Sequence, residues 1–428
     1  MILIKNGRLI DPKRKIDEVT DVVIKDGKIK SIGKIIKDEL EENESIRVID
    51  AKGCVVSPGL IDAHVHFRDP GYTYKEDLCT GAKSAAKGGF TTVVCMANTK
   101  PVVDNEETLK YVVEKAEELP IKVYQSSAIT KGFGGLELVD MELLKSKGAV
   151  GFTDDGLPLM NSRIVFEAMK KAAELDVVLS FHEEDAGLIS NPGVNSGMAS
   201  LGLGLGGASR AAEDTMVARD CMLAIYTGAK VNIQHISSGV SVDMVRFAKN
   251  QGAKVYAEAT PHHFTLTDAA IEKYGTNAKM NPPLRTEEDR LKIIKGLQDG
   301  TIDIIATDHA PHSQEEKNRS FVNSPSGIIG LETSLSLGIM SLVDRGYLTM
   351  MQLLEKMTTN PANLYGLDSG GIEVGKSADI VVFDPNKEWI AENFESKAIN
   401  SPFKGWTLKG VVKYTICKGA IAYENKNC

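Results

Sequence analysis

Ile61-Asp62-Ala63-His64-Val65-His66-Phe67-Arg68-Asp69-Pro70-Gly71 closes an apolar run that begins at Cys54. Alternate side chains of an extended strand point to the same side, so His64 and His66 converge on one point. Two imidazoles that meet at the end of a strand suit Zn²⁺ or a similar divalent ion. The stretch therefore predicts a metal site at the end of a strand.

Most of the other histidines follow the same pattern. Nearly all of them, and two acidic positions, close short β-branched runs where a strand gives way to a loop. The histidines are His182, His235, His262, His263, His309 and His312, and the acidic positions are Asp154-Asp155 and Asp308. A single buried histidine is more often a satisfied core residue, but their joint placement at strand ends favours a shared site.

Between residues 54 and 364, eight apolar runs alternate with amphipathic segments. The predicted strands end near His66, Met96, Ala128, Thr153, His182, His235, Thr260 and Thr307. The predicted helices include Glu76–Lys87, Glu106–Glu118, Arg163–Leu175, Ala211–Tyr226, Ser241–Asn250 and Glu287–Gln298. Eight strand–helix units predict a closed parallel (β/α)₈ barrel, a TIM-like α/β fold with its active site at the carboxyl ends of the strands. The candidate ligands all fall on that face.

Both ends of the chain carry short β segments with hairpin signals. These segments are Ile2–Ile4, Asp21–Ile24, Lys28–Ile32, Arg47–Asp50, Ala378–Phe383, Gly410–Cys417 and Ala420–Tyr423. Neither end alone has enough strands to bury a face. Residues 1–53 and 365–428 are therefore predicted to form one small β-sandwich domain beside a barrel of residues 54–364. Pro311–Gly327 lacks apolar periodicity and is predicted to be a mobile loop near the site.

Composition narrows the class of protein. The 428 residues are 42% hydrophobic and 25% charged, as in soluble globular proteins. A net charge of −8 argues against a nucleic-acid partner. No run approaches the roughly 18 apolar residues that cross a membrane. The apolar stretch at the N-terminus is too short for a signal peptide. A cytoplasmic protein is expected. The cysteines at 54, 79, 95, 221, 417 and 428 show no Cys-x-x-Cys spacing and are predicted to be reduced.

The candidate metal ligands form a set too large for one tetrahedral zinc. They are His64, His66, Asp155, His182, His235 and Asp308. Six ligands suit two metals that share a carboxylate and a water, whose pKa they lower, and such a pair also polarises a carbonyl. Asp308 can then take a proton from the attacking water and pass it to a leaving amide nitrogen. The set predicts metal-assisted hydrolysis of an amide-like bond, or its reverse.

Arg68 gives the clue to the substrate. It shares the strand parity of His64 and His66, so its guanidinium is predicted to point into the mouth of the barrel and to suit a carboxylate. The alternative is a structural ion pair at the rim. Asn98 and His312, at the ends of the second and eighth strands, could bind the same carboxylate and complete a carboxylate clamp with Arg68. Asn281, which follows the seventh strand, could bind an imide or ureide edge, although a lone Asn is more often a turn residue.

Four segments together resemble a known family. His64–Gly71, Phe152–Gly156, Thr307–His312 and Ser377–Pro385 are similar to motifs of the amidohydrolase superfamily, and more closely to those of the bacterial and archaeal dihydroorotases. The likeness covers almost the whole chain. It implies a zinc-dependent cyclic amidohydrolase that interconverts (S)-dihydroorotate and N-carbamoyl-L-aspartate, the third step of pyrimidine (UMP) biosynthesis. A hydroxide between two metals would attack the ring amide carbonyl, with Asp308 as general base and acid.

The resemblance also implies a role for each matching residue. His64, His66 and Asp308 would bind one Zn²⁺ and His182 and His235 the other, with Asp155 bridging the two. The residues that would hold the substrate are His66, Arg68, Asn98, Asn281, His312, Ser326 and Gly327. Of these, Arg68, Asn98 and His312 would hold the carboxylate.

Three departures from the family pattern concern the site. Many amidohydrolases bridge their metals with a carboxylated lysine, but residues 148–169 contain none, so an aspartate must serve. Met96-Ala97-Asn98-Thr99 stands where the family has Met-Pro-Asn-Thr, which loosens the turn that presents Asn98. Ser326-Gly327 stands where Phe-Gly is common, which changes the shape of a contact to the ring.

Two alternatives remain beside this interpretation. A hydantoinase, dihydropyrimidinase or allantoinase would share the barrel and the histidines, but its substrate generally lacks a ring carboxylate, which leaves Arg68 without a partner. A non-catalytic partner of aspartate transcarbamoylase would be expected to have lost ligands, whereas all six are present here. A homo-oligomer and an association with aspartate transcarbamoylase both stay open.

Overall fold

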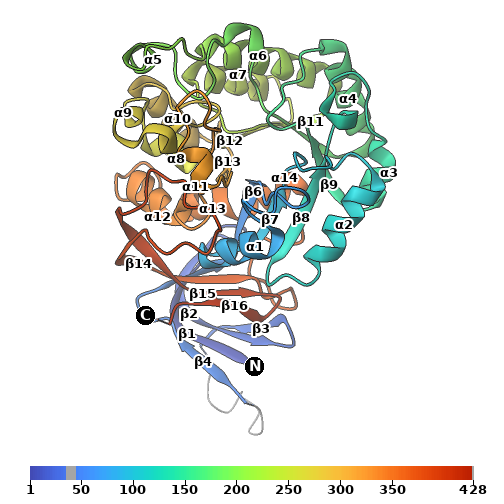
Figure 1. The fold of residues 1–428 in the computed structure, drawn as a ribbon. Coiled ribbons are helices and arrows are strands. Elements are labelled where there is room, and N and C mark those ends of the chain that lie inside the picture. Colours follow the sequence, from blue (N-terminus) through green and yellow to red (C-terminus); the bar gives the residue numbers. More distant parts are fainter. Residues whose placement is uncertain (35–44, 427–428) are drawn as a thin grey trace.

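In the computed structural model, which describes residues 1–34 and 45–426, eight parallel strands form a barrel (Figure 1). They are β6 (Leu60–Val65), β7 (Phe90–Cys95), β8 (Lys122–Ser127), β9 (Ala149–Thr153), β10 (Val178–Phe181), β11 (Lys230–Ile233), β12 (Val255–Ala259) and β13 (Ile304–Ile305). Each strand ends no more than two residues before the predicted position. The predicted barrel is confirmed, and neighbours in sequence are neighbours in the sheet.

The barrel is closed by contacts between the segment after β13 and the first strand, β6. Val65 and His309 form a parallel bridge, and the backbone N–H of His66 donates to the carbonyl of His309 at 2.9 Å. The buried carboxylate of Asp62 accepts from the backbone N–H of Thr307 at 3.1 Å, and burial raises its pKa to about 6. This seam brings His64, on β6, and His66, just after it, beside Asp308.

Helices surround the barrel, and the main core lies between them and the strands (Figure 1). The predicted helices are α1 (Leu78–Lys87), α2 (Glu106–Ala116), α4 (Ser162–Leu175), α6 (Arg210–Thr227), α7 (Gly239–Asn250) and α10 (Glu287–Asp299). Shorter helices that the sequence did not predict are α3 (Met141–Ser146), α5 (Met198–Gly202), α8 (Pro261–Thr265), α9 (Ala270–Tyr274), α11 (Gln314–Lys317), α12 (Ser334–Gly338), α13 (Met350–Met357) and α14 (Thr359–Tyr365). Most span five to eight residues, too few turns for a clear apolar period.

Both ends of the chain meet in a second sheet below the barrel (Figure 1). Its strands are β1 (Ile2–Asp11), β2 (Ile16–Lys25), β3 (Lys28–Ile32), β4 (Arg47–Asp50), β5 (Val55–Pro58), β14 (Ile380–Ile390), β15 (Thr407–Cys417) and β16 (Ala420–Glu424). Across the described residues, hydrogen bonds run without a break in the order β16-β15-β14-β5-β1-β2-β3, and β4 pairs with β1. Leu9, Val56 and Val382 share its buried core, so the predicted joining of the two termini is confirmed.

The apolar run from Cys54 to Ile61 is divided between the two sheets. β5 lies on the barrel side of the boundary predicted at residue 54, yet it pairs with β1 and β14 of the terminal sheet. The chain crosses to the barrel at Gly59, where a Cβ atom would lie only 2.1 Å from the hydroxyl of Thr91. A continuous apolar run gives no sign of such a crossing. The division of the chain into two domains stays a prediction.

The segment 311–327 is not structureless, because it contains α11 and is tied down by two buried lysines. Lys317 donates to the carbonyls of Pro325 and Gly327 at 3.0 and 3.3 Å. Lys279 donates to the carbonyls of Phe321 and Ser324, both at 2.7 Å. Its mobility remains a prediction, and these hydrogen bonds hold its backbone beside the site in this structure.

Two further expectations concern the chain as a whole. Within the described ranges, no helix is both long and apolar enough to cross a membrane. The five cysteines in the described part of the chain, at 54, 79, 95, 221 and 417, form no disulfide with one another, and Cys428 lies outside that part.

Candidate active site

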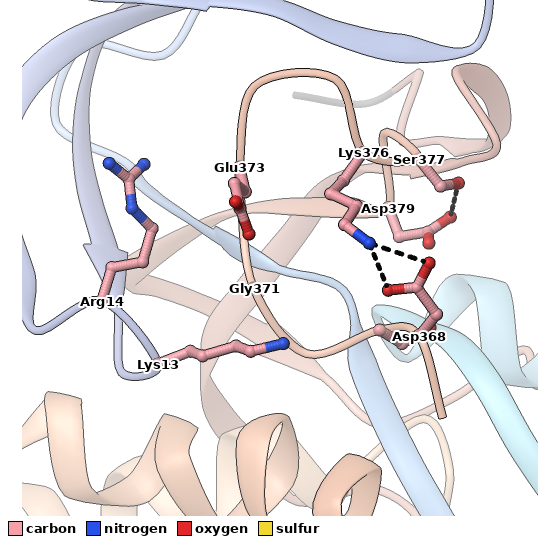
Figure 2. Close-up of a pocket in the computed structure, with 9 residues that line it drawn as sticks. Lys13, Arg14, Asp368, Gly371, Glu373, Lys376, Ser377 and Asp379 are labelled. Carbon is pink, nitrogen blue, oxygen red and sulfur yellow. Dashed lines mark hydrogen bonds and ion pairs between the residues drawn. The ribbon is translucent and has the colours of Figure 1, made fainter. Parts of the chain in front are cut away.

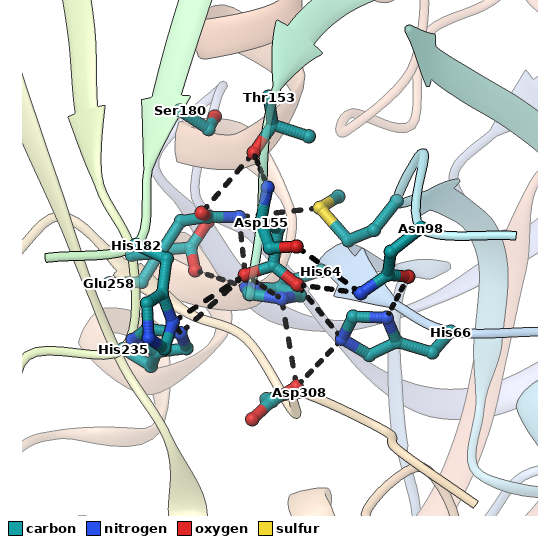
Figure 3. Close-up of polar contacts among 12 residues, drawn as sticks. His64, His66, Asn98, Thr153, Asp155, Ser180, His182, His235, Glu258 and Asp308 are labelled. Carbon is teal, nitrogen blue, oxygen red and sulfur yellow. Dashed lines mark hydrogen bonds and ion pairs between the residues drawn. The ribbon is translucent and has the colours of Figure 1, made fainter. Parts of the chain in front are cut away.

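A cavity of about 310 Å³ opens at the carboxyl ends of the barrel strands. Its lining includes His66, Arg68, Asn98, Asp155, His182, His235, Asn281, Asp308, His312, Ser326 and Gly327. These are all of the predicted site residues except His64, which is fully buried and contacts Asp155 from within the barrel (Figure 3). The fold thus brings together side chains from β6 to the segment after β13.

Asp155 lies at the centre of the candidate ligands (Figure 3). Its carboxylate is 3.4 Å from Nε2 of both His64 and His66, and 3.7 and 3.9 Å from the facing nitrogens of His235 and His182. Among the described residues, two groups have ligand atoms within 4.8 Å of one another: His64, His66 and Asp155, and Asp155, His182 and His235. Asp155 belongs to both groups, which is the arrangement that a bridging ligand requires.

Asp308 completes the first group, because its carboxylate lies 3.0 Å from Nε2 of His66 and 3.6 Å from Nε2 of His64. Burial by itself raises the pKa of Asp308, but the hydrogen bond from His66 and the charges of the histidines outweigh it and hold the pKa well below its usual range. Asp155 is shifted in the same direction, against its burial, by His64 and His235. Both carboxylates are therefore ionised at neutral pH.

The donor set fits divalent metal ions. Burial lowers the pKa of His64, but Asp155 and Glu258 outweigh it and hold the pKa well above its ordinary value, so the site favours positive charge. His64 Nε2 is buried without a hydrogen-bond partner in the described part of the chain. Imidazole nitrogens and carboxylate oxygens are the ligands that zinc prefers in hydrolytic sites. The residues present thus suit the metals that the sequence predicts.

Glu258, on β12, is a site residue that the sequence reasoning missed. Its fully buried carboxylate lies 3.1 Å from Nδ1 of His64 and accepts from Asn232 Nδ2 at 2.7 Å. A carboxylate accepts hydrogen bonds, so with a metal bound His64 would donate from Nδ1 to Glu258 and offer the lone pair of Nε2 to the metal. A glutamate inside the apolar strand Val255-Tyr256-Ala257-Glu258-Ala259 was the signal available in the sequence.

Glu258→Gln should lower the affinity for metal by about 10–100-fold, the usual effect of changing a partner of a metal-binding histidine. The amide is neutral and can donate as well as accept, so it no longer enforces one tautomer of His64. Competition with a chromophoric chelator would measure the affinity. Thermal unfolding of the metal-free variant would serve as the control for folding. Wild-type affinity in a folded variant would show that Glu258 does not orient His64.

Arg68 reaches the cavity by a different route from the predicted one. β6 ends at Val65, and Arg68 adopts a left-handed conformation with φ of 60°, so strand parity does not aim its side chain. Its Nε donates to the carbonyl of Pro311 at 3.4 Å, and its Nη2 lies 3.4 Å from Nε2 of His312. His235 and Asp308 also have positive φ, of 31° and 48°. Such backbone is strained for residues with side chains and is concentrated at functional sites.

Asn98 and Asn281 differ in the atoms that they leave free. The amide of Asn98 is engaged by the ligands, with Oδ1 2.8 Å from Nδ1 of His66 and Nδ2 3.3 Å from Asp155, so it orients His66. Asn281 donates to Glu184 at 2.9 Å, and within the described residues its buried Oδ1 has no partner. Asn281 Oδ1 is therefore free to accept a ring N–H.

Ser326 and Gly327 line the cavity, but the backbone of Gly327 is already hydrogen-bonded. Its N–H donates to the carbonyl of Lys279 at 2.9 Å, and both lone pairs of its carbonyl accept, from Asn400 at 3.0 Å and from Lys317 at 3.3 Å. A backbone contact from Gly327 to a substrate ring would require one of these bonds to open. Sequence reasoning could not foresee this, because Asn400 lies far along the chain.

Other candidates at strand ends have structural roles. Asp154 accepts from the backbone N–H groups of Ile129 and Thr130 at 2.7 and 3.1 Å, and burial raises its pKa to about 6. His263, on α8, contacts Thr260 Oγ1 at 2.7 Å and the carbonyl of Pro282 at 3.1 Å. Its neighbour His262 has a pKa lowered to about 4 by burial.

A second hollow, of about 350 Å³, lies beside the terminal sheet (Figure 2). Lys376 pairs there with Asp368 at 3.1 Å, and Asp379 accepts from Lys122 at 2.6 Å and from Ser377 at 3.2 Å. Neither of the two metal-ligating groups found in the described residues lies in this hollow. Asp368 and Asp379 are both paired with lysines there, so the metal-ligating groups are confined to the cavity at the strand ends.

A parallel barrel with two histidine–carboxylate groups around one shared aspartate has the fold and site of an amidohydrolase. The comparison with known families agrees, because the model of the amidohydrolase family matches residues 55–422. The chain therefore belongs to the amidohydrolase family, and within it to the group of its dihydroorotase relatives.

Its relatives include two clostridial proteins. The dihydroorotase of Clostridioides difficile (strain 630) is 67% identical over 424 residues, which cover 99% of this chain and 100% of the relative. The dihydroorotase of Clostridium acetobutylicum is 55% identical, and the match covers 100% of both chains.

Solved structures with the same fold include two hydantoinases. The L-hydantoinase (dihydropyrimidinase) of Arthrobacter aurescens has a TM-score of 0.86 at 25% identity and covers 99% of this chain and 96% of its own. The D-hydantoinase (dihydropyrimidinase) of a Thermus species has a TM-score of 0.84 at 26% identity and covers 99% and 95%. The likeness thus extends over both the barrel and the terminal sheet.

Proposed function

We propose that this protein is a dihydroorotase, which interconverts (S)-dihydroorotate and N-carbamoyl-L-aspartate in pyrimidine biosynthesis. The observation that carries the proposal is the placement of Arg68 and His312 in the same cavity as the ligand cluster, with Nη2 and Nε2 3.4 Å apart. A forked cation beside a hydrolytic centre suits a cyclic amide that also bears a carboxylate. Relatives named dihydroorotase at 67% and 55% identity support the same choice.

The proposed cofactor is a pair of zinc ions. His64, His66 and Asp308 would hold one ion, His182 and His235 the other, and Asp155 both. When bound, such metals act as Lewis acids toward a carbonyl and lower the pKa of water. The cytoplasm is the proposed location, where the cysteine thiols in the described residues would stay reduced.

The residues of this chain would divide the reaction among them. Arg68 and His312 would hold the carboxylate, and Oδ1 of Asn281 would accept a ring N–H, so that the scissile amide faces the ligand cluster. Water adds to the amide carbonyl, and the carboxylate of Asp308 takes its proton. As the C–N bond breaks, Asp308 would return that proton to the leaving nitrogen. The reverse sequence closes the ring.

Hydantoinase activity is the second candidate, because the hydantoinases named above share the fold over nearly the whole chain. The deciding experiment compares turnover of dihydroorotate, hydantoin and allantoin by one preparation of known metal content. The dihydroorotase proposal expects turnover of dihydroorotate alone or in large excess. Faster turnover of hydantoin or allantoin would reject it in favour of another cyclic amidase.

Arg68→Met should lower kcat/KM for both dihydroorotate and N-carbamoyl-L-aspartate by about one to two decades. A charge-assisted hydrogen bond is worth roughly 1.5–3 kcal/mol, and both directions of the reaction use the same clamp. Neutral cyclic ureides offer the guanidinium nothing to hold, so any slow turnover of them should hardly change. Equal losses on neutral and anionic substrates, at wild-type metal content, would make Arg68 a structural residue of the rim.

A further inference from the structure

Lys75, in the loop between β6 and α1, lies behind the proposed carboxylate clamp. Its Nζ is 3.2 Å from Nδ1 of His312 and 2.9 Å from Glu316 Oε1 on α11. The same ammonium lies over the rings of Tyr72 and Tyr74, at 5.5 and 5.6 Å from their centroids. Burial and the charge of Arg68 lower the pKa of Lys75, whereas the ion pair with Glu316 and the two aromatic faces favour the charged form of the amine. Lys75 does not line the cavity, whereas Arg68 and His312 do.

The hydrogen-bond donors around His312 determine which of its ring nitrogens carries the hydrogen. A lysine ammonium has three N–H donors and no acceptor, so Nδ1 of His312 must accept from Lys75. Burial, with the nearby charges of Arg68 and Lys75, holds the pKa of His312 far below its ordinary value, so the ring is neutral and carries one N–H. That N–H is then on Nε2.

Two donors consequently face each other across the clamp. Arg68 is a donor at every nitrogen, and its Nη2 lies 3.4 Å from Nε2 of His312, which also carries a hydrogen. Two N–H groups at this distance repel each other unless an acceptor lies between or beside them. We propose that Lys75 is a positioning residue that holds His312 as the Nε2–H tautomer, so that Arg68 and His312 together offer their N–H groups to a single carboxylate. The identity of that carboxylate, the one on the dihydropyrimidine ring, rests on the proposed function.

Without Lys75, Arg68 and His312 would hydrogen-bond to each other instead of to the substrate carboxylate. Glu316 Oε2 lies 3.7 Å from Nδ1 of His312 and could accept a hydrogen from it. The ring would then carry its hydrogen on Nδ1, and the lone pair of Nε2 would accept from Arg68. The substrate carboxylate would then lose the N–H of His312 as a donor. It would also compete with His312 for the N–H groups of Arg68.

Lys75→Met should therefore raise KM for dihydroorotate and for N-carbamoyl-L-aspartate by about tenfold, the usual loss for one charge-assisted hydrogen bond, while kcat stays near the wild-type value. Lys75→Arg keeps a donor toward Nδ1 and should restore most of the affinity. Tyr74→Phe is the matched control, because it removes the contact of Tyr74 with Glu316 at 3.1 Å but leaves Lys75 in place. Lys75→Leu, which also lacks a donor, serves as a second variant if Lys75→Met does not fold.

The tautomer can be measured independently of turnover. Nitrogen-15 spectra of labelled histidine rings, assigned with His312→Asn, should show Nε2–H in the wild type and Nδ1–H in Lys75→Met. An Nδ1–H ring in the wild type, an unchanged tautomer in the variant, or a loss confined to kcat would each overturn the inference. A tautomer change without a change in KM would overturn its link to the carboxylate. A wild type that does not turn over dihydroorotate would instead reject the proposed function, and the spectra would still decide the role of Lys75.

Discussion

Asp308→Asn is expected to lower kcat by about 10²–10⁴-fold while most of the metal stays bound, because general acid–base catalysis is usually worth that much. The amide oxygen of asparagine can still serve as a metal ligand, but the side chain cannot take up a proton. In the wild type, the contact with His66 at 3.0 Å and the charges of the histidines keep the carboxylate ionised. The proton acceptor is thus lost with little change of shape. Both directions should slow equally, since the same group moves the proton each way.

Asp154→Asn is the matched control for this experiment. Asp154 is also a buried aspartate at a strand end, but it binds the backbone of Ile129 and Thr130, outside the ligand groups. The Asp154→Asn substitution should change the free energy of unfolding more than it changes the rate of turnover. Metal content would be measured for each variant, so that lost metal is not mistaken for lost proton transfer. Turnover of Asp308→Asn within a few-fold of wild type, at full metal content, would assign Asp308 a structural role.

Removal of metal is expected to abolish turnover and to lower the melting temperature. Asp155 and Asp308 lie among four buried histidines, and a chelator would deprive this cluster of the cations that we propose it binds. A ligand at a hundred times its Kd stabilises a folded protein by about 2.7 kcal/mol, so the shift in melting should be measurable. Zinc added back should restore both properties. Elemental analysis should find close to two metals per chain in the active protein, as two-metal hydrolytic sites require.

His235→Ala tests the two-group arrangement directly. It removes a member of only one of the two groups that share Asp155. About one metal per chain should remain, with little activity, because the second ion of a two-metal site is lost. A wild type that holds at most one metal and is fully active would contradict the two-metal proposal.

The positions of the candidate ligands could be predicted because two simple rules act together. Apolar runs end where polar residues begin, and parallel strands in a barrel present their carboxyl ends on one face. His182 and His235 therefore had to lie near each other, and their facing nitrogens are 2.9 Å apart. The orientation of side chains beyond the strand ends was harder to predict. Arg68 reaches the cavity through a left-handed turn that strand periodicity does not encode.

The features that could not be predicted from the sequence depend on contacts between segments that are far apart along the chain. Glu258 and Lys75 act on histidines 194 and 237 residues away, and no local pattern connects such pairs. The same holds for the terminal sheet, where β5 pairs with β14. Hydrophobic periodicity shows that a strand exists and which face is buried, but not which strand it joins. The division of the run from Cys54 to Ile61 at Gly59 is one result of this limit.

The pairing of β5 with β14 also has a consequence for synthesis on the ribosome. Val55–Pro58 must wait for Ile380–Ile390, more than 300 residues later, before their hydrogen bonds can form. During translation the N-terminal strands therefore expose an unpaired edge, which is prone to pair with other chains. A nascent chain that stalls before β14 would keep that edge open, however well its barrel strands had assembled. Synthesis of β14, β15 and β16, and not of the barrel alone, is the event that completes the sheet.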